Sequence, residues 1–254
     1  MNLTNYPSFQ FRDRKSTDFN MRVLNDMSFT IPEMDLDFTE VEGQNKEFIK
    51  DKNRYKSFTK IFPVRLFKEE DRTIANQLRE IAVWLRSSKD YSPLIFSEYD
   101  EYYYMALGYQ EITIKDKYRE RVDLEISFKC QPFIFRTDGR EEQLVNQNSV
   151  LHNPEMFFSQ PKLIFERPYP NSRTTISING LNFDIDAGAG SGPITMDCEN
   201  GIAFDDKGKN VSSYCFLNSQ GIYTPITLSP GDNSFYLANV RNLRVVPRWR
   251  TLAV

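Results

Sequence analysis

The sequence predicts a mainly β protein of two domains. We expect an N-terminal β-rich domain with one α-helix over residues 1–137 and a C-terminal β-sandwich over residues 138–254. Apolar residues recur at every second position over much of the chain, and one segment has a helical repeat. Of the 11 glycines, only Gly43 and Gly108 precede residue 136. The glycine content therefore rises after the polar stretch 136–142, whose Asp-Gly turn signal is typical of a linker.

One segment of the N-terminal half has the period of an α-helix, from about Asp71 to Ser87. Its apolar stripe consists of Ile74, Leu78, Ile81 and Leu85. Spacings of four, three and four residues place these side chains on one face of a helix. Either Asp71 or Thr73 can cap the start. Trp84 lies off the centre of the stripe, so we expect it at the margin or on a second contact surface.

Elsewhere in this half the apolar period is two, which is the period of a β-strand. The run Val122–Cys130 alternates regularly and predicts a strand with one buried face and one solvated face. The run Met34–Thr39 alternates apolar residues with aspartates. The acidic residues between Glu33 and Glu42 have the pattern of a solvated strand face.

The second half contains a β-hairpin whose register the sequence specifies. A two-residue turn at Asn179-Gly180 pairs Ile178 with Leu181 and Ile176 with Phe183, with all four on one face. A second hairpin follows, and its apolar residues share one parity: Ile194, Met196, Cys198, Ile202 and Phe204. This parity predicts a three-residue loop, 199–201, with Gly201 in the left-handed conformation. Short strands and frequent turns favour a sandwich.

The composition gives little support to an enzyme or a nucleic-acid-binding protein. His152 is the single histidine, and we expect it in a loop or on the surface. A net charge of −3 is too small to steer nucleic acid or an anionic membrane. No segment has the length of a membrane span or the pattern of a signal peptide, so we expect synthesis in a cytosol.

The three cysteines, Cys130, Cys198 and Cys215, are odd in number and widely spaced. This argues against a disulfide framework and a zinc site, and we expect Cys130 and Cys198 to be buried thiols. Asp184-Ile185-Asp186 resembles the start of a calcium loop, but Thr195 stands where a bidentate glutamate is needed. We expect a strand with outward acidic residues there. The sequence predicts no catalytic, cofactor-binding or metal-ligating residue, and no cofactor.

Aromatic residues make up 14% of the chain and concentrate between residues 91 and 109. Three consecutive tyrosines, Tyr102, Tyr103 and Tyr104, cannot all face one way in a strand. We therefore expect at least one of them to be exposed or at an interface, where tyrosine is favoured.

The N-terminal half contains two blocks of short motifs. The first block joins Ser16-Thr17-Asp18-Phe19, Phe29-Thr30-Ile31-Pro32 and Val41-Glu42-Gly43-Gln44-Asn45. The second joins the helix, Tyr91–Phe96, Tyr102–Ala106 and Ile126–Phe133. These blocks resemble the distal tail protein family of long-tailed phages that infect Gram-positive bacteria. The turn at Gln44 departs from the family, which often has arginine there.

The resemblance continues into the C-terminal half, so it covers nearly the whole chain. The third block joins Ile178–Gly180, Ile194–Glu199, Leu228–Asn233 and Pro247–Arg250. Each motif is short and degenerate, and the order and spacing of the blocks are the specific signal.

The resemblance implies a structural protein of the virion and no enzyme. It implies an N-terminal ring-forming domain, a galectin-like or carbohydrate-binding-module-like C-terminal sandwich, and a hexameric ring at the tail tip assembled in the host cytoplasm. The ring would join the tail tube protein to the tail-associated or fibre protein, and in some phages it carries receptor-binding proteins. The short connections in the C-terminal half predict no long arm.

Two alternative functions remain open. The C-terminal sandwich alone is compatible with a carbohydrate-binding module that contacts the host cell wall. Such modules need exposed aromatic platforms, and Trp249, in the terminal strand, is expected to be packed. A cell-wall hydrolase is the other alternative, but the sequence offers no nucleophile, base or metal constellation for it.

Overall fold

The computed structural model describes residues 6–24 and 29–254 and divides the chain into two compact units. Unit 1 comprises Met1–Ile134 together with Leu252–Val254, and unit 2 comprises Phe135–Thr251. The last residues of the chain therefore belong to the first unit: Ala253 is fully buried, and its N–H donates to the Pro132 carbonyl at 2.9 Å.

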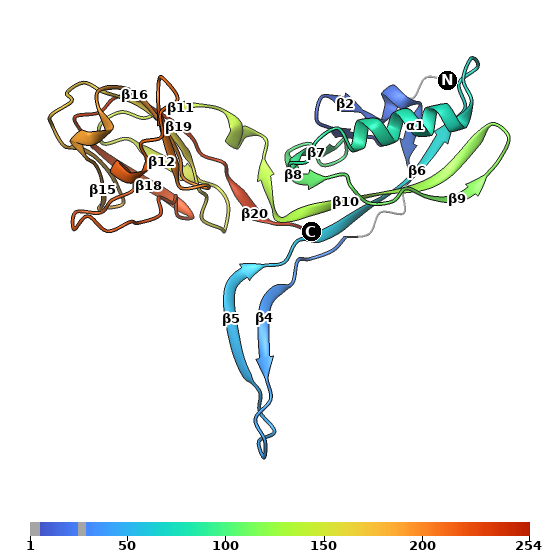
Figure 1. The fold of residues 1–254 in the computed structure, drawn as a ribbon, viewed down its shortest axis with the longest axis horizontal. Helices are drawn as coiled ribbons and strands as arrows, with labels where there is room; N and C mark the ends of the chain where they lie inside the picture. The colour runs from blue at the N-terminus through green and yellow to red at the C-terminus, as the bar shows by residue number, and fades with distance from the viewer. Residues whose placement is uncertain (1–5, 25–28) are drawn as a thin grey trace. The chain divides into compact units, whose positions relative to one another are not determined.

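Unit 1 is built on a nine-stranded sheet that curls into a half-barrel (Figure 1). The main strand order is β2-β1-β7-β8-β10-β6-β3, and β9 and β20 also pair with β10. The strands are β1 (Phe9–Phe11), β2 (Arg14–Lys15), β3 (Met21–Val23), β6 (Phe58–Phe67), β7 (Ser92–Phe96), β8 (Tyr102–Leu107), β9 (Thr113–Lys117), β10 (Arg121–Arg136) and β20 (Arg250–Leu252). The last two residues of β10 and the first two of β20 belong to unit 2.

The predicted alternation in β10 is confirmed. Val122, Leu124, Ile126, Phe128 and Cys130 are each at most 1% exposed. They pack in the core of unit 1 with the apolar residues of β6 and β1. The intervening residues of β10 lie on the opposite, outer face of the sheet.

The predicted helix is α1, which spans Ile74–Leu85 and covers the core side of the sheet. Thr73 is the N-cap residue, and its side chain accepts a hydrogen bond from the Asn76 N–H, so Thr73 and not Asp71 caps the helix. Ile81 and Leu85 are buried, and Ile74 and Leu78 pack partly against the same core.

Two further strands of unit 1, β4 (Met34–Thr39) and β5 (Phe48–Tyr55), form a separate two-stranded sheet. Figure 1 shows this hairpin running away from the curled sheet as an isolated ribbon. The chain also contains short 3-10 segments: η1 (Ser16–Phe19), η2 (Asp138–Arg140), η3 (Ala187–Ala189) and η4 (Ser212–Tyr214).

Unit 2 consists of two antiparallel sheets around a single core, as the predicted sandwich requires. The first sheet has the order β11 (Gln143–Leu144), β19 (Arg241–Val246), β13 (Lys162–Arg167), β16 (Gly192–Asp197) and β17 (Ile202–Asp205). The second has the order β12 (Val150–Asn153), β18 (Gly231–Ala238), β14 (Thr174–Ile178) and β15 (Leu181–Ile185).

The register predicted for the first hairpin of unit 2 is confirmed. Ile178 pairs with Leu181 and Ile176 with Phe183 across a turn in which Asn179 and Gly180 both have positive φ, as a type I′ turn needs. Ile176, Ile178 and Phe183 are buried, whereas Leu181 is 63% exposed. The four residues share one face as predicted, and Leu181, next to the turn, is the one that the core does not cover.

The register predicted for the second hairpin is wrong by one residue. Met196 pairs with Ala203 and not with Phe204, and the loop has four residues, 198–201. The Asp197 carboxylate accepts hydrogen bonds from the N–H groups of Glu199 and Asn200 and thereby holds the wider loop. Gly201 has a φ of +64°, as expected.

Candidate assembly surfaces

The hairpin β4–β5 exposes an apolar face. Met34, Leu36 and Phe38 lie on one side of β4, and Phe38 stands opposite Ile49 of β5. Phe38 is 57% exposed and Ile49 is 62% exposed. No residue of unit 1 within the described ranges buries this pair. An isolated hairpin with exposed apolar side chains is marginal in water and typically has a partner.

The other face of the hairpin carries a network of ion pairs. Lys52 Nζ lies 3.3 Å from Asp35 and 2.6 Å from Asp37, and Arg54 lies 2.6 Å from Asp35. The hydrogen bond from Arg54, followed by the contacts with Lys52, lowers the pKa of Asp35. The network links the two strands at the point where their register shifts, between the Met34–Tyr55 and Leu36–Asp51 pairs.

The burial of β4 differs from the sequence expectation at Asp35, while Asp37 is exposed as expected. Asp35, expected on a solvated face, is 8% exposed, whereas Met34 is 49% exposed. Long Lys52 and Arg54 side chains cover Asp35, whereas Met34 and Phe38 are exposed and Leu36 is half-buried. Alternation predicted the two faces but not which one is covered.

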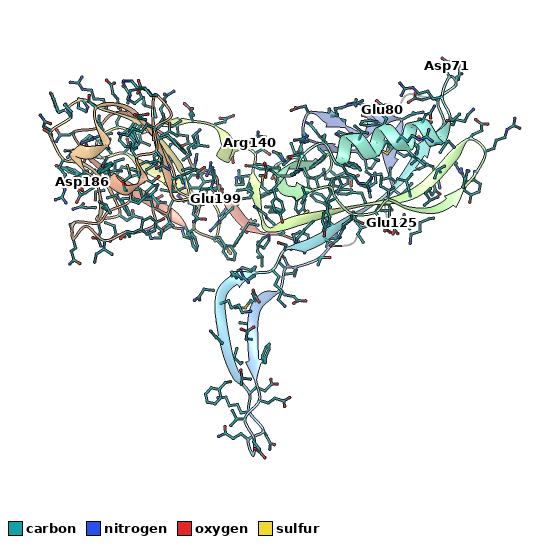
Figure 2. All side chains as sticks on the ribbon, in the orientation of Figure 1. Asp71, Glu80, Glu125, Arg140, Asp186 and Glu199 are labelled. Atoms are coloured by element: carbon teal, nitrogen blue, oxygen red, sulfur yellow. The ribbon has the colours of Figure 1, made fainter. Side chains whose placement is uncertain are left out.

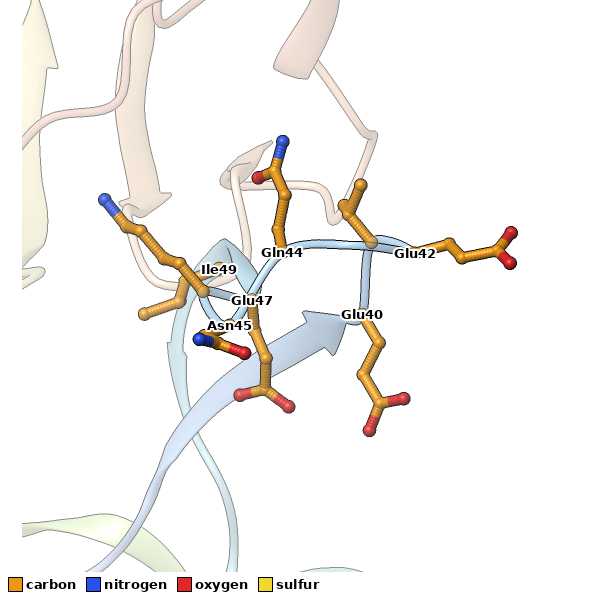
Figure 3. Close-up of a pocket in the computed structure, with 8 residues that line it drawn as sticks. Glu40, Glu42, Gln44, Asn45, Glu47 and Ile49 are labelled. Carbon is orange, nitrogen blue, oxygen red and sulfur yellow. The ribbon is translucent and has the colours of Figure 1, made fainter.

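The tip of the hairpin, which we define as residues 40–47, is acidic. Glu40, Glu42 and Glu47 are exposed, and none makes an ion pair with any residue that the structure describes. Figure 3 shows an open hollow at this tip, with the Glu40 and Glu47 side chains directed to the same side. Its lining comes from the hairpin alone, so we interpret it as a recess of the loop and not as a substrate pocket.

The polar residues that the sequence suggested for catalysis or metal binding do not come together in one site. His152 is exposed on β12, and its Nδ1 lies 2.7 Å from Oδ1 of Asp232, a partner that the sequence did not indicate. Asp186 is exposed at the end of β15 (Figure 2). Asp184, expected to point outward, is 3% exposed, which corrects that expectation. Thr175 donates to its carboxylate at 2.6 Å, and Arg173 lies 3.2 Å away.

The cysteines are free and buried, as predicted for Cys130 and Cys198. Burial raises the pKa of Cys130 and of Cys215 to about 12. Within the described residues, no group of three or more histidine, cysteine or acidic side chains could hold a metal ion. None of the helices in the described ranges is long and apolar enough to cross a bilayer.

The aromatic residues are distributed differently from the expectation. Tyr103 is 7% exposed, and Tyr102 and Tyr104 are half-buried against the core, so none of the three is fully exposed; that one of them lies at an interface stays a prediction. Both faces of β8 are covered at this point. The exposed tyrosines of the cluster are Tyr99 and Tyr109.

Unit 2 has an exposed aromatic side chain that the sequence analysis missed. Trp249 is 3% exposed, as expected, but Tyr236 is 55% exposed on the outer face of the four-stranded sheet. It stands opposite Ser177, which in turn pairs with Asn182. Side chains alternate between buried and exposed along β18, where Phe235 is buried, and this alternation could have indicated that Tyr236 is exposed.

Comparisons with solved structures support the resemblance found in the sequence. The chain matches the crystal structure of SPP1 Dit, described as a paradigm of the hub adsorption apparatus in phages that infect Gram-positive bacteria. The TM-score is 0.67 at 14% identity, over 95% of this chain and 97% of that chain.

Two structures of the phage p2 baseplate in its activated conformation also match. The one with strontium has a TM-score of 0.54 at 9% identity, over 95% of this chain and 97% of that chain. The one with calcium has a TM-score of 0.52 at 10% identity, over 94% and 96%. No family model and no curated protein matches the chain. At these identities the comparisons establish the fold, which is that of SPP1 Dit over nearly the whole chain.

Proposed function

We propose that this chain is a structural subunit of a phage tail tip, forming a hexameric ring that joins the tail tube to the tail-associated or fibre protein. The observation that carries the proposal is the match of both units, in one chain, to the fold of SPP1 Dit. The proposed role is mechanical and belongs to the assembled virion. It assigns no catalytic, cofactor or metal role to any residue.

The hairpin β4–β5 supports the assembly part of this proposal. A ring needs a heterologous contact, in which one surface of a subunit binds a different surface of the next. The exposed pair Phe38 and Ile49 gives the hairpin an apolar face to bury in such a contact. We therefore assign ring formation to the N-terminal domain, residues 1–137, with the hairpin reaching a neighbouring copy.

The C-terminal domain, residues 138–254, is proposed as a galectin-like sandwich that faces other tail components. Its two sheets and single core are compatible with that architecture. Its connections are short, so we propose no long arm. A receptor-binding protein is a further candidate partner.

Electron microscopy of the purified full chain, alone and mixed with the tail-associated protein of the same phage, tests the proposal. We expect rings with six-fold symmetry. Particles of single-chain size in both samples would count against the proposal.

Saccharide binding by unit 2 is a second candidate function, favoured by Tyr236. An exposed aromatic ring beside polar side chains is the usual platform for a sugar. Binding of cell-wall polysaccharide to the full chain, lost on Tyr236→Ala and kept on Tyr169→Ala, would support it. Tyr169 is a suitable control because it is 51% exposed. Equal binding by both variants would exclude Tyr236 as the platform.

A further inference from the structure

The outer face of the curled sheet carries a row of arginines. Arg22 of β3 pairs in register with Arg65 of β6, which pairs with Asp123 of β10. Arg121 lies two residues before Asp123 and therefore on the same face. The opposite face of these strands is the core of unit 1. We call Arg22, Arg65 and Arg121 the arginine row.

Only one arginine of the row forms an ion pair with a described residue. Arg65 Nε and Nη2 donate to the two carboxylate oxygens of Asp123, each at 2.6 Å. Among the described side chains, which leave out that of Asp116, Arg22 and Arg121 make no ion pair, and the Nε atom of each has no hydrogen-bond partner.

Aromatic rings hold the two unpaired guanidinium groups in place. The Arg22 guanidinium carbon lies 4.8 Å from the centre of the Tyr6 ring and 5.4 Å from that of Phe67. The Arg121 guanidinium carbon lies 4.5 Å from the centre of the Tyr118 ring. Tyr6 is 38% exposed and Tyr118 is 49% exposed, so the row offers cationic and apolar surface together. A positioned guanidinium loses less entropy when it binds a carboxylate.

The hairpin has the complementary chemistry. Phe38 and Ile49 form its apolar face. Glu40 and Glu47 directly follow and precede the last strand pair, Thr39–Phe48, and their side chains are directed to the same side (Figure 3). Like charges on the same side of a hairpin repel, so an external cation would stabilise this end. The face that presents Phe38 therefore ends in two carboxylates.

We propose that the hairpin tip of one copy of this chain binds the arginine row of a second copy. Glu40 and Glu47 would pair with Arg22 and Arg121, while Phe38 and Ile49 pack on the exposed rings beside them. The hairpin is long enough, because about nine extended residues from Glu33 to Glu42 span roughly 30 Å. This inference rests on the proposed ring and names its contact.

Cysteine cross-linking of full-length chains tests the contact without removing any charge of the arginine row or any glutamate of the tip. One chain carries Gln44→Cys at the tip, and the other carries Glu120→Cys beside Arg121. The native cysteines are buried and do not compete. The control pairs Gln44→Cys with Arg79→Cys, on the exposed side of α1 and across the sheet from the row.

On mild oxidation we expect a disulfide-linked dimer between Gln44→Cys and Glu120→Cys chains, and little or none with Arg79→Cys. Equal yields with the two partners, or no product with either, would overturn the contact. The absence of any product would overturn the contact even if wild-type chains associate weakly, because disulfide formation accumulates pairs that form only transiently.

Charge exchange provides an independent measurement. Arg22→Glu/Arg121→Glu and Glu40→Arg/Glu47→Arg should each weaken self-association roughly tenfold or more, and the chain with all four changes should regain it. Arg79→Glu is the matched control, since Arg79 is exposed on α1 and lies across the sheet from the row. An equal loss with Arg79→Glu, or no recovery in the fourfold variant, would contradict the proposal. Circular dichroism confirms that each variant is folded.

The two proposals fail in different ways. Six-fold rings without the specific cross-link would overturn the tip-to-row contact and leave the proposed function standing. Absence of both rings and cross-link would overturn both.

Discussion

Trp84 of α1 stacks on Phe19 of η1 with the ring centroids 4.4 Å apart and the planes inclined by 22°. The Trp84 indole N–H also donates to the Phe11 carbonyl at 3.3 Å. Trp84 thus packs in the same core as Ile81 and Leu85 of the apolar stripe. Of the two positions that the sequence left open, Trp84 occupies the margin of the stripe.

Truncating Trp84 should destabilise unit 1 strongly. Because the ring is 6% exposed and stacks on Phe19, Trp84→Ala should lower the free energy of unfolding by about 3–5 kcal/mol. Urea unfolding followed by circular dichroism measures this change. Val83→Ala is the control, since Val83 is 71% exposed and should change stability by no more than about 0.5 kcal/mol. Similar losses in the two variants would contradict the described packing.

The pair Arg65–Asp123 should make stability depend on acid pH. Hydrogen bonds from Arg65 hold the pKa of Asp123 below its ordinary value. The folded-state pKa is therefore lower than that of the unfolded chain. The stabilisation is fully present above about pH 4, the ordinary carboxyl range, and is lost as pH falls through the folded-state pKa.

Asp123→Asn should remove this pH-dependent part. Near neutral pH the variant should be less stable by about 1.5–3 kcal/mol, as expected for hydrogen bonds to charged groups. The difference from wild type should shrink as the pH falls below about 4. Unfolding midpoints at several pH values measure it, with Asp90→Asn as an exposed control. A constant difference across this range would disagree with the ion pair.

The thiols should be unreactive in the folded protein. Cys130 and Cys215 are each at most 1% exposed, and burial raises the pKa of both to about 12, so little thiolate forms at pH 8. Ellman's reagent should label no cysteine rapidly in the native protein and all three after denaturation. Fast labelling of a native thiol would show that its surroundings are open.

Much of the core could be predicted from the sequence, because parity and periodicity are local signals. The alternation of Val122–Cys130, the stripe of α1 and the turn at Asn179-Gly180 depend on neighbouring residues alone. The second hairpin of unit 2 escaped because Asp197 accepts hydrogen bonds from its own loop and widens it. The hydrogen bonds accepted by the Asp197 side chain therefore set the loop length, and the alternation of the apolar residues does not.

The assembly surface was less accessible to sequence reasoning. Which face of β4 is covered depends on Lys52 and Arg54, which come from another strand and enclose Asp35. The arginine row joins three strands that are distant in the sequence, so only the register of the sheet reveals it. Tyr236 is different, since the alternation along β18, where Phe235 is buried, is a local signal for its exposure.

The apolar face of the hairpin should be needed for assembly and not for folding. Phe38→Ser/Ile49→Ser removes apolar surface that is already in water, so the stability of the single chain should not decrease. Thr39→Ser, on the other face, is the matched control.

Light scattering on the full-length protein over a range of concentrations is the most direct measurement of the central claim. The wild-type chain and Thr39→Ser should approach six times the chain mass, and Phe38→Ser/Ile49→Ser should remain at the mass of one chain with an unchanged circular dichroism spectrum. A wild-type protein that stays at the mass of one chain throughout, or a double variant that assembles equally well, would contradict the account.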